Sequence, residues 1–146
     1  MDLTVPSINV WAVLLATAAA MIVGFVYYHP KVAGTHWMRA IGHTDETVGR
    51  GPKPWVYPVL IVCAVITAWV LAGAAWISFE FYGGSFFVNA VVTALILWAG
   101  FTAVRVVVHD AFDPRGFSVT GHTVLNELLT VLAMAVVIGL WPPAGA

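Results

Sequence analysis

Four apolar stretches, each long enough to cross a lipid bilayer, limit what this chain can fold into more than any other feature. They cover residues 8–28, 57–79, 86–108 and 121–141, and only the last two contain a charged side chain, Arg105 and Glu127. A membrane-spanning helix needs roughly 20 mainly apolar residues. Because lipid offers no partner to an unpaired backbone group, all four stretches should be helical. The sequence therefore predicts an all-α integral membrane bundle of four transmembrane helices, forming a single domain over residues 1–146.

The scarcity of charge supports a membrane location for most of the chain. Hydrophobic residues make up 61% of the sequence and charged residues only 9%, whereas soluble domains contain about 25% charged residues. The net charge of −1 gives no indication of a nucleic-acid partner. The single cysteine, Cys63, rules out an intrachain disulfide and a thiolate metal cluster.

The basic residues predict the orientation in the membrane. Four of the six lie between the first two stretches and two lie at or near the loop between the last two: Lys31, Arg39, Arg50, Lys53, Arg105 and Arg115. Cytoplasmic loops of membrane proteins are enriched in Lys and Arg. We therefore expect loops 29–56 and 109–120 to face the cytoplasm and both termini to lie outside.

The first of these loops contains a short helical pattern. Pro30 should end the first span, because the residue before a proline disfavours helix. Residues 32–41 then combine Val32, Trp37, Met38 and Ile41 with Lys31 and Arg39, which is typical of an amphipathic helix at the membrane interface.

Small residues mark two helix faces for close packing. Helices in lipid associate through close backbone approach, and a spacing of four places each set on one face: Ala16, Ala20 and Gly24 in the first span, and Ala64, Ala68 and Ala72 in the second. Since four helices bury little interior, we expect a homo-oligomer, with a further membrane-protein partner as an alternative.

The two intramembrane charges are the first candidate site. Charges within a span are costly and are usually paired or functional. At 1.5 Å per residue, Arg105 and Glu127 should lie about 5 and 9 Å from the same membrane edge, within side-chain reach of each other. We predict an Arg105–Glu127 ion pair with Asn126 and His109 nearby, either as a structural staple or as a polar lining for an ion, a proton or a small anionic substrate.

The histidines are the second candidate site. His29, His36, His43, His109 and His122 all fall near the predicted cytoplasmic edge. Three or four imidazoles and carboxylates can hold zinc or a similar ion, so a metal site formed by His29, His36, His43 and His122 is one interpretation. Solvated interfacial histidines are the other, because His29 precedes a proline and His43 follows a glycine, so the four do not share one helix. No cofactor is predicted.

The chain also resembles a known family over nearly its whole length. The pattern lies in residues 9–42 and in a closing hairpin that ends in Gly-Leu-Trp, and it includes Asn9, Trp11, Tyr28, Pro30, Trp37, Met38, Gly139, Leu140 and Trp141. It is similar to the small bacterial membrane proteins grouped as domain of unknown function 1761. The resemblance implies four spans in the bacterial cytoplasmic membrane and supplies no activity, cofactor or catalytic residue.

These observations leave three classes of function open. The first is an oligomeric channel-like or transporter-like protein, or one that binds a small ligand through its cytoplasmic polar face. The second is an accessory or scaffold subunit of a larger membrane complex. The third is a metal-dependent membrane enzyme that uses the histidines and carboxylates, which the absence of paired metal-ligand motifs disfavours.

Overall fold

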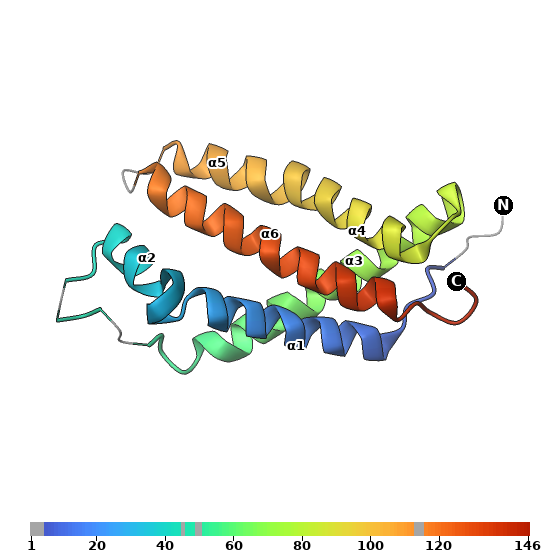
Figure 1. Ribbon diagram of the computed structural model, residues 1–146, viewed down its shortest axis with the longest axis horizontal. Coiled ribbons are helices and arrows are strands. Elements are labelled where there is room, and N and C mark those ends of the chain that lie inside the picture. Colours follow the sequence, from blue (N-terminus) through green and yellow to red (C-terminus); the bar gives the residue numbers. More distant parts are fainter. Residues whose placement is uncertain (1–4, 45, 49–50, 113–115) are drawn as a thin grey trace.

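The protein is a bundle of four long antiparallel helices (Figure 1). This computed structural model describes residues 5–44, 46–48, 51–112 and 116–146. The first, second and fourth spans are α1 (Val10–Tyr27), α3 (Val56–Tyr82) and α6 (Phe117–Leu140). The third span consists of α4 (Phe86–Leu97), the π-helical segment η2 (Trp98–Ala103) and α5 (Val104–Asp110). The prediction of an all-helical, four-span protein is confirmed, and such apolar helices imply a lipid environment.

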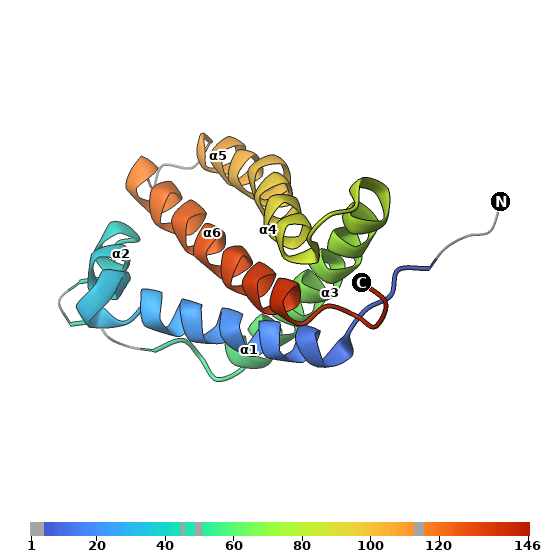
Figure 2. The same cartoon turned by 45° about the vertical axis from the view of Figure 1, so that its right-hand side comes forward.

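Both chain ends lie at one end of the bundle, which we call the terminal end (Figure 1). The opposite end, which we call the loop end, carries the connection between α1 and α3 and the start of α6. The helix α6 lies between α1 and α4, and α3 packs against both α1 and α4 (Figures 1 and 2). Toward the loop end, α3 diverges from α5 in both views.

Local sequence explains where the helices begin and end. The Asn9 side chain accepts hydrogen bonds from the backbone N–H groups of Trp11 and Ala12, which caps α1. At the other end of α1, His29 is extended, with φ −62° and ψ 139°, because Pro30 follows it. The helix α6 begins at Phe117, four residues before the predicted start at 121. The prediction was late because it followed apolarity, and the first turn of α6 contains the polar residues Ser118 and Thr120.

The predicted short helix in the first loop is present and is confirmed. It consists of η1 (Pro30–Gly34), a π-helical turn, followed by α2 (Thr35–Ala40). The chain folds back sharply here: a Cβ atom added to Gly34 would overlap the backbone carbonyl oxygen of Tyr28. Only glycine fits this close approach, and the resulting turn directs α2 toward α6, against which it packs.

The buried core lies in the half of the bundle nearer the terminal end. It is built mainly from small residues, so that the helix backbones approach closely. Its members come from α1, α3, α4 and α6: Val13, Ala16, Ala20, Ala68, Leu71, Ala72, Ala75, Phe86, Ala90, Ala94, Met134, Ala135 and Ile138. At the loop end the helices are less tightly packed, and every residue of α3 from 57 to 63 is exposed.

Only part of each predicted small-residue face is buried in the helix core. Ala16 and Ala20 of α1, and Ala68 and Ala72 of α3, lie in the core. Ala64 is only partly buried against it, and a Cβ atom at Gly24 would meet nothing within 4 Å. The close helix contact that the Gly24 spacing predicts is not made, because the bundle has already begun to open at this depth.

Two asparagines fasten the terminal end. Asn9 donates from Nδ2 to the carbonyl oxygen of Trp141 at 3.3 Å, which joins the start of α1 to the end of α6. Asn89 of α4 accepts from the Ser78 hydroxyl at 2.7 Å and donates to the carbonyl oxygens of Gly83 and Ser85, which closes the α3–α4 hairpin. Each amide is thus satisfied within the protein, as a polar side chain at membrane depth must be.

The closest approach of α4 and α6 yields a first prediction. A Cβ atom at Gly139 would lie 2.9 Å from Cδ2 and 3.0 Å from Cα of Phe87. Gly139→Ala should therefore separate the helices and cost about 1–3 kcal/mol of unfolding free energy, measured by thermal or denaturant unfolding in detergent. Gly121→Ala in the same helix meets nothing within 4 Å and serves as the control. Equal stability of the two variants would contradict this packing.

Candidate functional site

A groove opens at the loop end between α2, α5 and α6. Its volume is about 660 Å³, and it is lined by both apolar and polar side chains: Trp37, Ile41, Arg105, Val106, His109, Asp110, Val119 and Thr123. Binding pockets for small molecules usually measure roughly 300–1,000 Å³ and combine apolar walls with a few polar groups. The groove thus has the size and the composition of a small-molecule site.

Trp37, which lines the α2 wall of the groove, packs against an aromatic residue at the end of α1. The rings of Tyr28 and Trp37 lie 4.9 Å apart, and Tyr27 packs edge-on against Tyr28 at 5.1 Å. The sharp turn at Gly34 brings Trp37 back over Tyr28, although the two are nine residues apart in the sequence. The sequence placed Trp37 in a short interfacial helix and gave no signal that its ring would meet that of Tyr28.

Glu127 lies one helical turn deeper than the groove-lining residues of α6. Val119, Thr123 and Glu127 are spaced by four residues and so share one face of the helix. Glu127 is ten residues from the start of α6, or about 15 Å along the helix axis. Its side chain is exposed. In the part of the chain that the structure describes, Glu127 forms no ion pair with a lysine or arginine.

Burial and neighbouring charges both act on the hydroxyl of Tyr28, which follows the last residue of α1. Burial raises the pKa of the Tyr28 hydroxyl to about 12, and the negative charges of ionised Tyr27 and Glu127 add to this increase. Glu127 itself lies one turn beyond Thr123, on the face of α6 that lines the groove.

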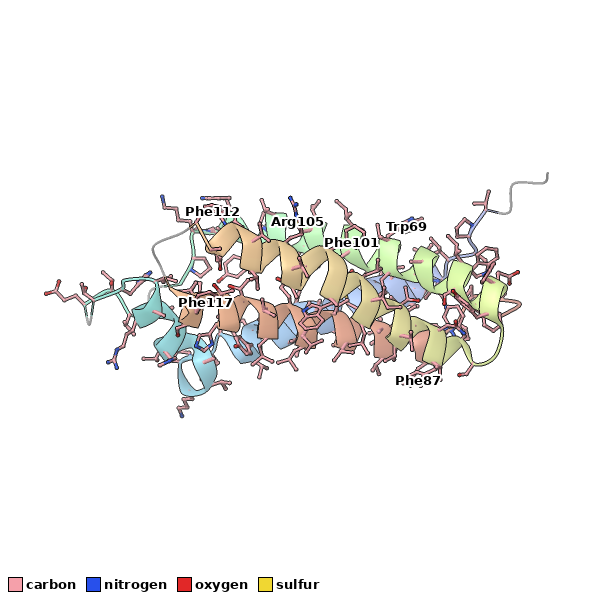
Figure 3. The ribbon with its side chains drawn as sticks, turned by 90° about the horizontal axis from the view of Figure 1, so that it is seen from above. Trp69, Phe87, Phe101, Arg105, Phe112 and Phe117 are labelled. Atoms are coloured by element: carbon pink, nitrogen blue, oxygen red, sulfur yellow. The ribbon has the colours of Figure 1, made fainter. Side chains whose placement is uncertain are left out.

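The ion pair predicted between Arg105 and Glu127 is not formed. Arg105 is exposed, and its side chain points away from α6 (Figure 3). The cause is the π-helical segment η2, whose hydrogen bonds run from residue i to i+5 and so add one residue to the helical turn. After η2, the residues that face α6 are therefore one position further along the chain than in an uninterrupted α-helix. Val106 and Asp110 are consequently turned toward α6, and Arg105 lies at the edge of the groove.

The other polar residues predicted for this site are placed separately. His109 Nδ1 lies 3.1 Å from the Asp110 carboxylate, which also accepts a hydrogen bond from the Thr120 hydroxyl at 2.8 Å. This network joins α5 to the start of α6. Asn126 lies one turn beyond His122, and its buried side-chain oxygen has no hydrogen-bond partner among the described residues. It is an acceptor that a donor would stabilise.

Two of the four histidines considered for a metal site come together. The rings of His36 and His122 lie 5.3 Å apart, and His122 Nδ1 is 3.0 Å from the Tyr27 hydroxyl. His29 instead accepts from the backbone N–H of Lys31, and His43 contacts the carbonyl oxygen of Thr47. Among the described residues no group of three or more His, Cys, Asp or Glu side chains could hold a metal ion.

With this geometry established, comparison with known proteins gives the family. The family model described as protein of unknown function (DUF1761) matches residues 11–139. The chain belongs to this family. The membership inferred from the sequence is thereby confirmed. No curated protein and no solved structure matches the chain, so the site of this DUF1761 protein is interpreted from its own residues.

The raised pKa of Tyr28 yields a second prediction. Because the folded protein favours the protonated hydroxyl, this contribution to stability is complete below about pH 10 and is lost as the pH rises through about 12. In an alkaline titration followed by tyrosinate absorbance, Tyr28→Phe should remove a step near pH 12. Glu127→Gln should move that step to lower pH, because it removes a neighbouring negative charge. Tyr57→Phe, at the start of α3, should not change the pH of the step near 12. If Glu127→Gln also left the pH of that step unchanged, Glu127 would not act on Tyr28.

Proposed function

We propose that this protein binds a small organic cation in the groove at the loop end, with Glu127 as its counter-ion. The observation that carries the proposal is a carboxyl group well inside a membrane span, with no described lysine or arginine paired to it. Such a group is costly in a membrane unless it is paired or neutral. A bound ammonium group would supply the missing charge.

The aromatic wall supports the choice of a cation. Aromatic faces attract ammonium and guanidinium groups, with Trp the strongest, and Trp37 lines the groove with its ring 4.9 Å from that of Tyr28. Arg105 lies at the edge of the groove, but its side chain points away from α6 and therefore away from Glu127 (Figure 3). Asp110, a second acid, also lines the groove.

The packing of the bundle favours binding over a pore through a single chain. The half nearer the terminal end is filled by apolar side chains. The two buried polar side chains there already form hydrogen bonds within the protein: Thr17 with Val13, and Asn89 with Ser78, Gly83 and Ser85. A path for an ion past this core would need polar groups that are free to replace its water. Transport, if it occurs, would require a path between copies of the chain or an opening of the core.

The distribution of basic residues supports an orientation in which the groove opens to the cytoplasm. Lys31, Arg39 and Lys53 belong to the loop end, whereas segments 1–9, 80–85 and 141–146 contain no lysine or arginine. Cytoplasmic loops carry the excess of basic residues. Arg50 and Arg115, which also support this orientation, lie outside the described residues.

The test uses n-butylamine, which is cationic at neutral pH, and butyrate as its anionic control. Calorimetry on the purified protein in nanodiscs should detect binding of butylamine and not of butyrate. Glu127→Gln should weaken butylamine binding roughly tenfold or more, equivalent to about 1.4 kcal/mol. Trp37→Leu should cost about 0.5–1 kcal/mol through loss of the aromatic face.

The matched control is Glu80→Gln, which removes an exposed acid at the terminal end of α3. It should leave butylamine affinity unchanged. Binding of butyrate as tightly as butylamine, or equal affinities for the Glu127→Gln and wild-type proteins, would refute a cation site at Glu127.

A further inference from the structure

We propose that His36 and His122 together bind a divalent transition-metal ion at the loop end, and that Tyr27 holds His122 in position for it. The ion would join α2 to α6. This inference is independent of the proposed function, because the metal site uses neither Glu127 nor a residue that lines the groove.

The fold brings together two histidines from distant parts of the chain. His36 lies in the first turn of α2, and His122 lies in the second turn of α6. The helix α2 reaches α6 because the chain turns sharply at Gly34, where a Cβ atom would overlap the carbonyl oxygen of Tyr28. The pairing of the two rings thus depends on that turn, and residue spacing gave no sign of it.

The separation of the two rings fits a shared metal ion. Zinc lies about 2.0–2.1 Å from a bound imidazole nitrogen, and therefore about 3.2 Å from the centre of that ring. Two imidazoles on one tetrahedral ion then have ring centres about 5.2 Å apart. The ring centroids of His36 and His122 are 5.3 Å apart. Because His36 is exposed, water can reach such an ion and fill its remaining coordination positions.

Tyr27 supplies the support that a metal-binding histidine usually has. Such a histidine donates from its second ring nitrogen to an oxygen acceptor, which fixes both the tautomer and the direction of the ring. The Tyr27 hydroxyl is 3.0 Å from His122 Nδ1. With Nδ1 bonded in this way, Nε2 is the nitrogen of His122 that binds the ion. Tyr27 is itself buried and packs edge-on against Tyr28, so its hydroxyl is held in place.

The chemistry of the two ligands selects the class of metal. Imidazole suits copper, nickel and zinc, and among the divalent ions of this series Cu²⁺ binds nitrogen ligands most tightly. Catalytic zinc sites usually have three protein ligands. Two histidines are one fewer, so we assign metal binding to this pair and not catalysis.

The experiment counts the nitrogen atoms bound to the metal. One equivalent of Cu²⁺ is added to the purified, tag-free protein in nanodiscs, and the electron paramagnetic resonance spectrum shows a splitting from each directly bound nitrogen. We expect two imidazole nitrogens for the wild-type protein, and at most one for His36→Gln and for His122→Gln. Circular dichroism checks that each variant is folded.

The matched controls are His29→Gln and His43→Gln, whose imidazoles contact the backbone of Lys31 and Thr47 instead. Both should keep two bound nitrogens. A two-nitrogen spectrum that survives in a folded His36→Gln or His122→Gln variant would overturn the site. So would a wild-type spectrum with fewer than two nitrogens, which would leave the contact between the two rings as packing alone.

The positioning role of Tyr27 is tested with Zn²⁺ by calorimetry. Tyr27→Phe keeps the ring and removes the hydroxyl, and it should weaken Zn²⁺ binding by about 10–100-fold, the usual effect of losing a group that orients a metal ligand. The Cu²⁺ spectrum of this variant should still show two nitrogens, which distinguishes lost orientation from lost folding. Tyr57→Phe is the control and should bind Zn²⁺ as tightly as the wild-type protein. Equal affinity in Tyr27→Phe would remove Tyr27 from the site.

Discussion

The close packing of alanine-rich helix faces in one half of the bundle is the constraint on which the rest of the structure depends. Ala16, Ala68, Ala75, Ala90 and Ala135 are almost completely buried, and their small side chains let the helix backbones approach where hydrophobicity gives no drive for association. This half also holds the asparagine-mediated ties. Because the four helices are fixed there, they can diverge at the loop end without coming apart, and the divergence makes room for the groove.

Two short departures from α-helical geometry decide which side chains line that groove. The turn through η1 brings Trp37 against Tyr28, and the π-helical segment η2 turns Val106 and Asp110 toward α6 in place of Arg105. π-Helical turns occur often at functional sites, because they change the facing register without breaking the helix. In this protein the expected Arg105–Glu127 ion pair is absent among the described residues, and Trp37 lies in the groove wall against Tyr28.

An unpaired carboxyl group within a membrane span must be neutralised, and the two remedies available to it are a proton and a cation. The proposed binding of a cation at Glu127 would meet this electrostatic requirement. The groove on the same face of α6 is where the proposed cation would enter. It lies at the end of the bundle to which most of the basic residues belong.

The sequence by itself determined the class of fold, because the length and apolarity of four stretches leave helices as the only stable spanning structure. It also located the end of α1 at Pro30, the short helix after it and the two intramembrane charges. Tertiary structure alone decided whether those two charges, Arg105 and Glu127, face each other. Residue spacing assumes an uninterrupted α-helical period, so it placed Arg105 opposite Glu127 and Gly24 in a helix contact. The one-residue shift at η2 and the divergence of the helices depend on packing between segments distant in the chain, and no local pattern records them.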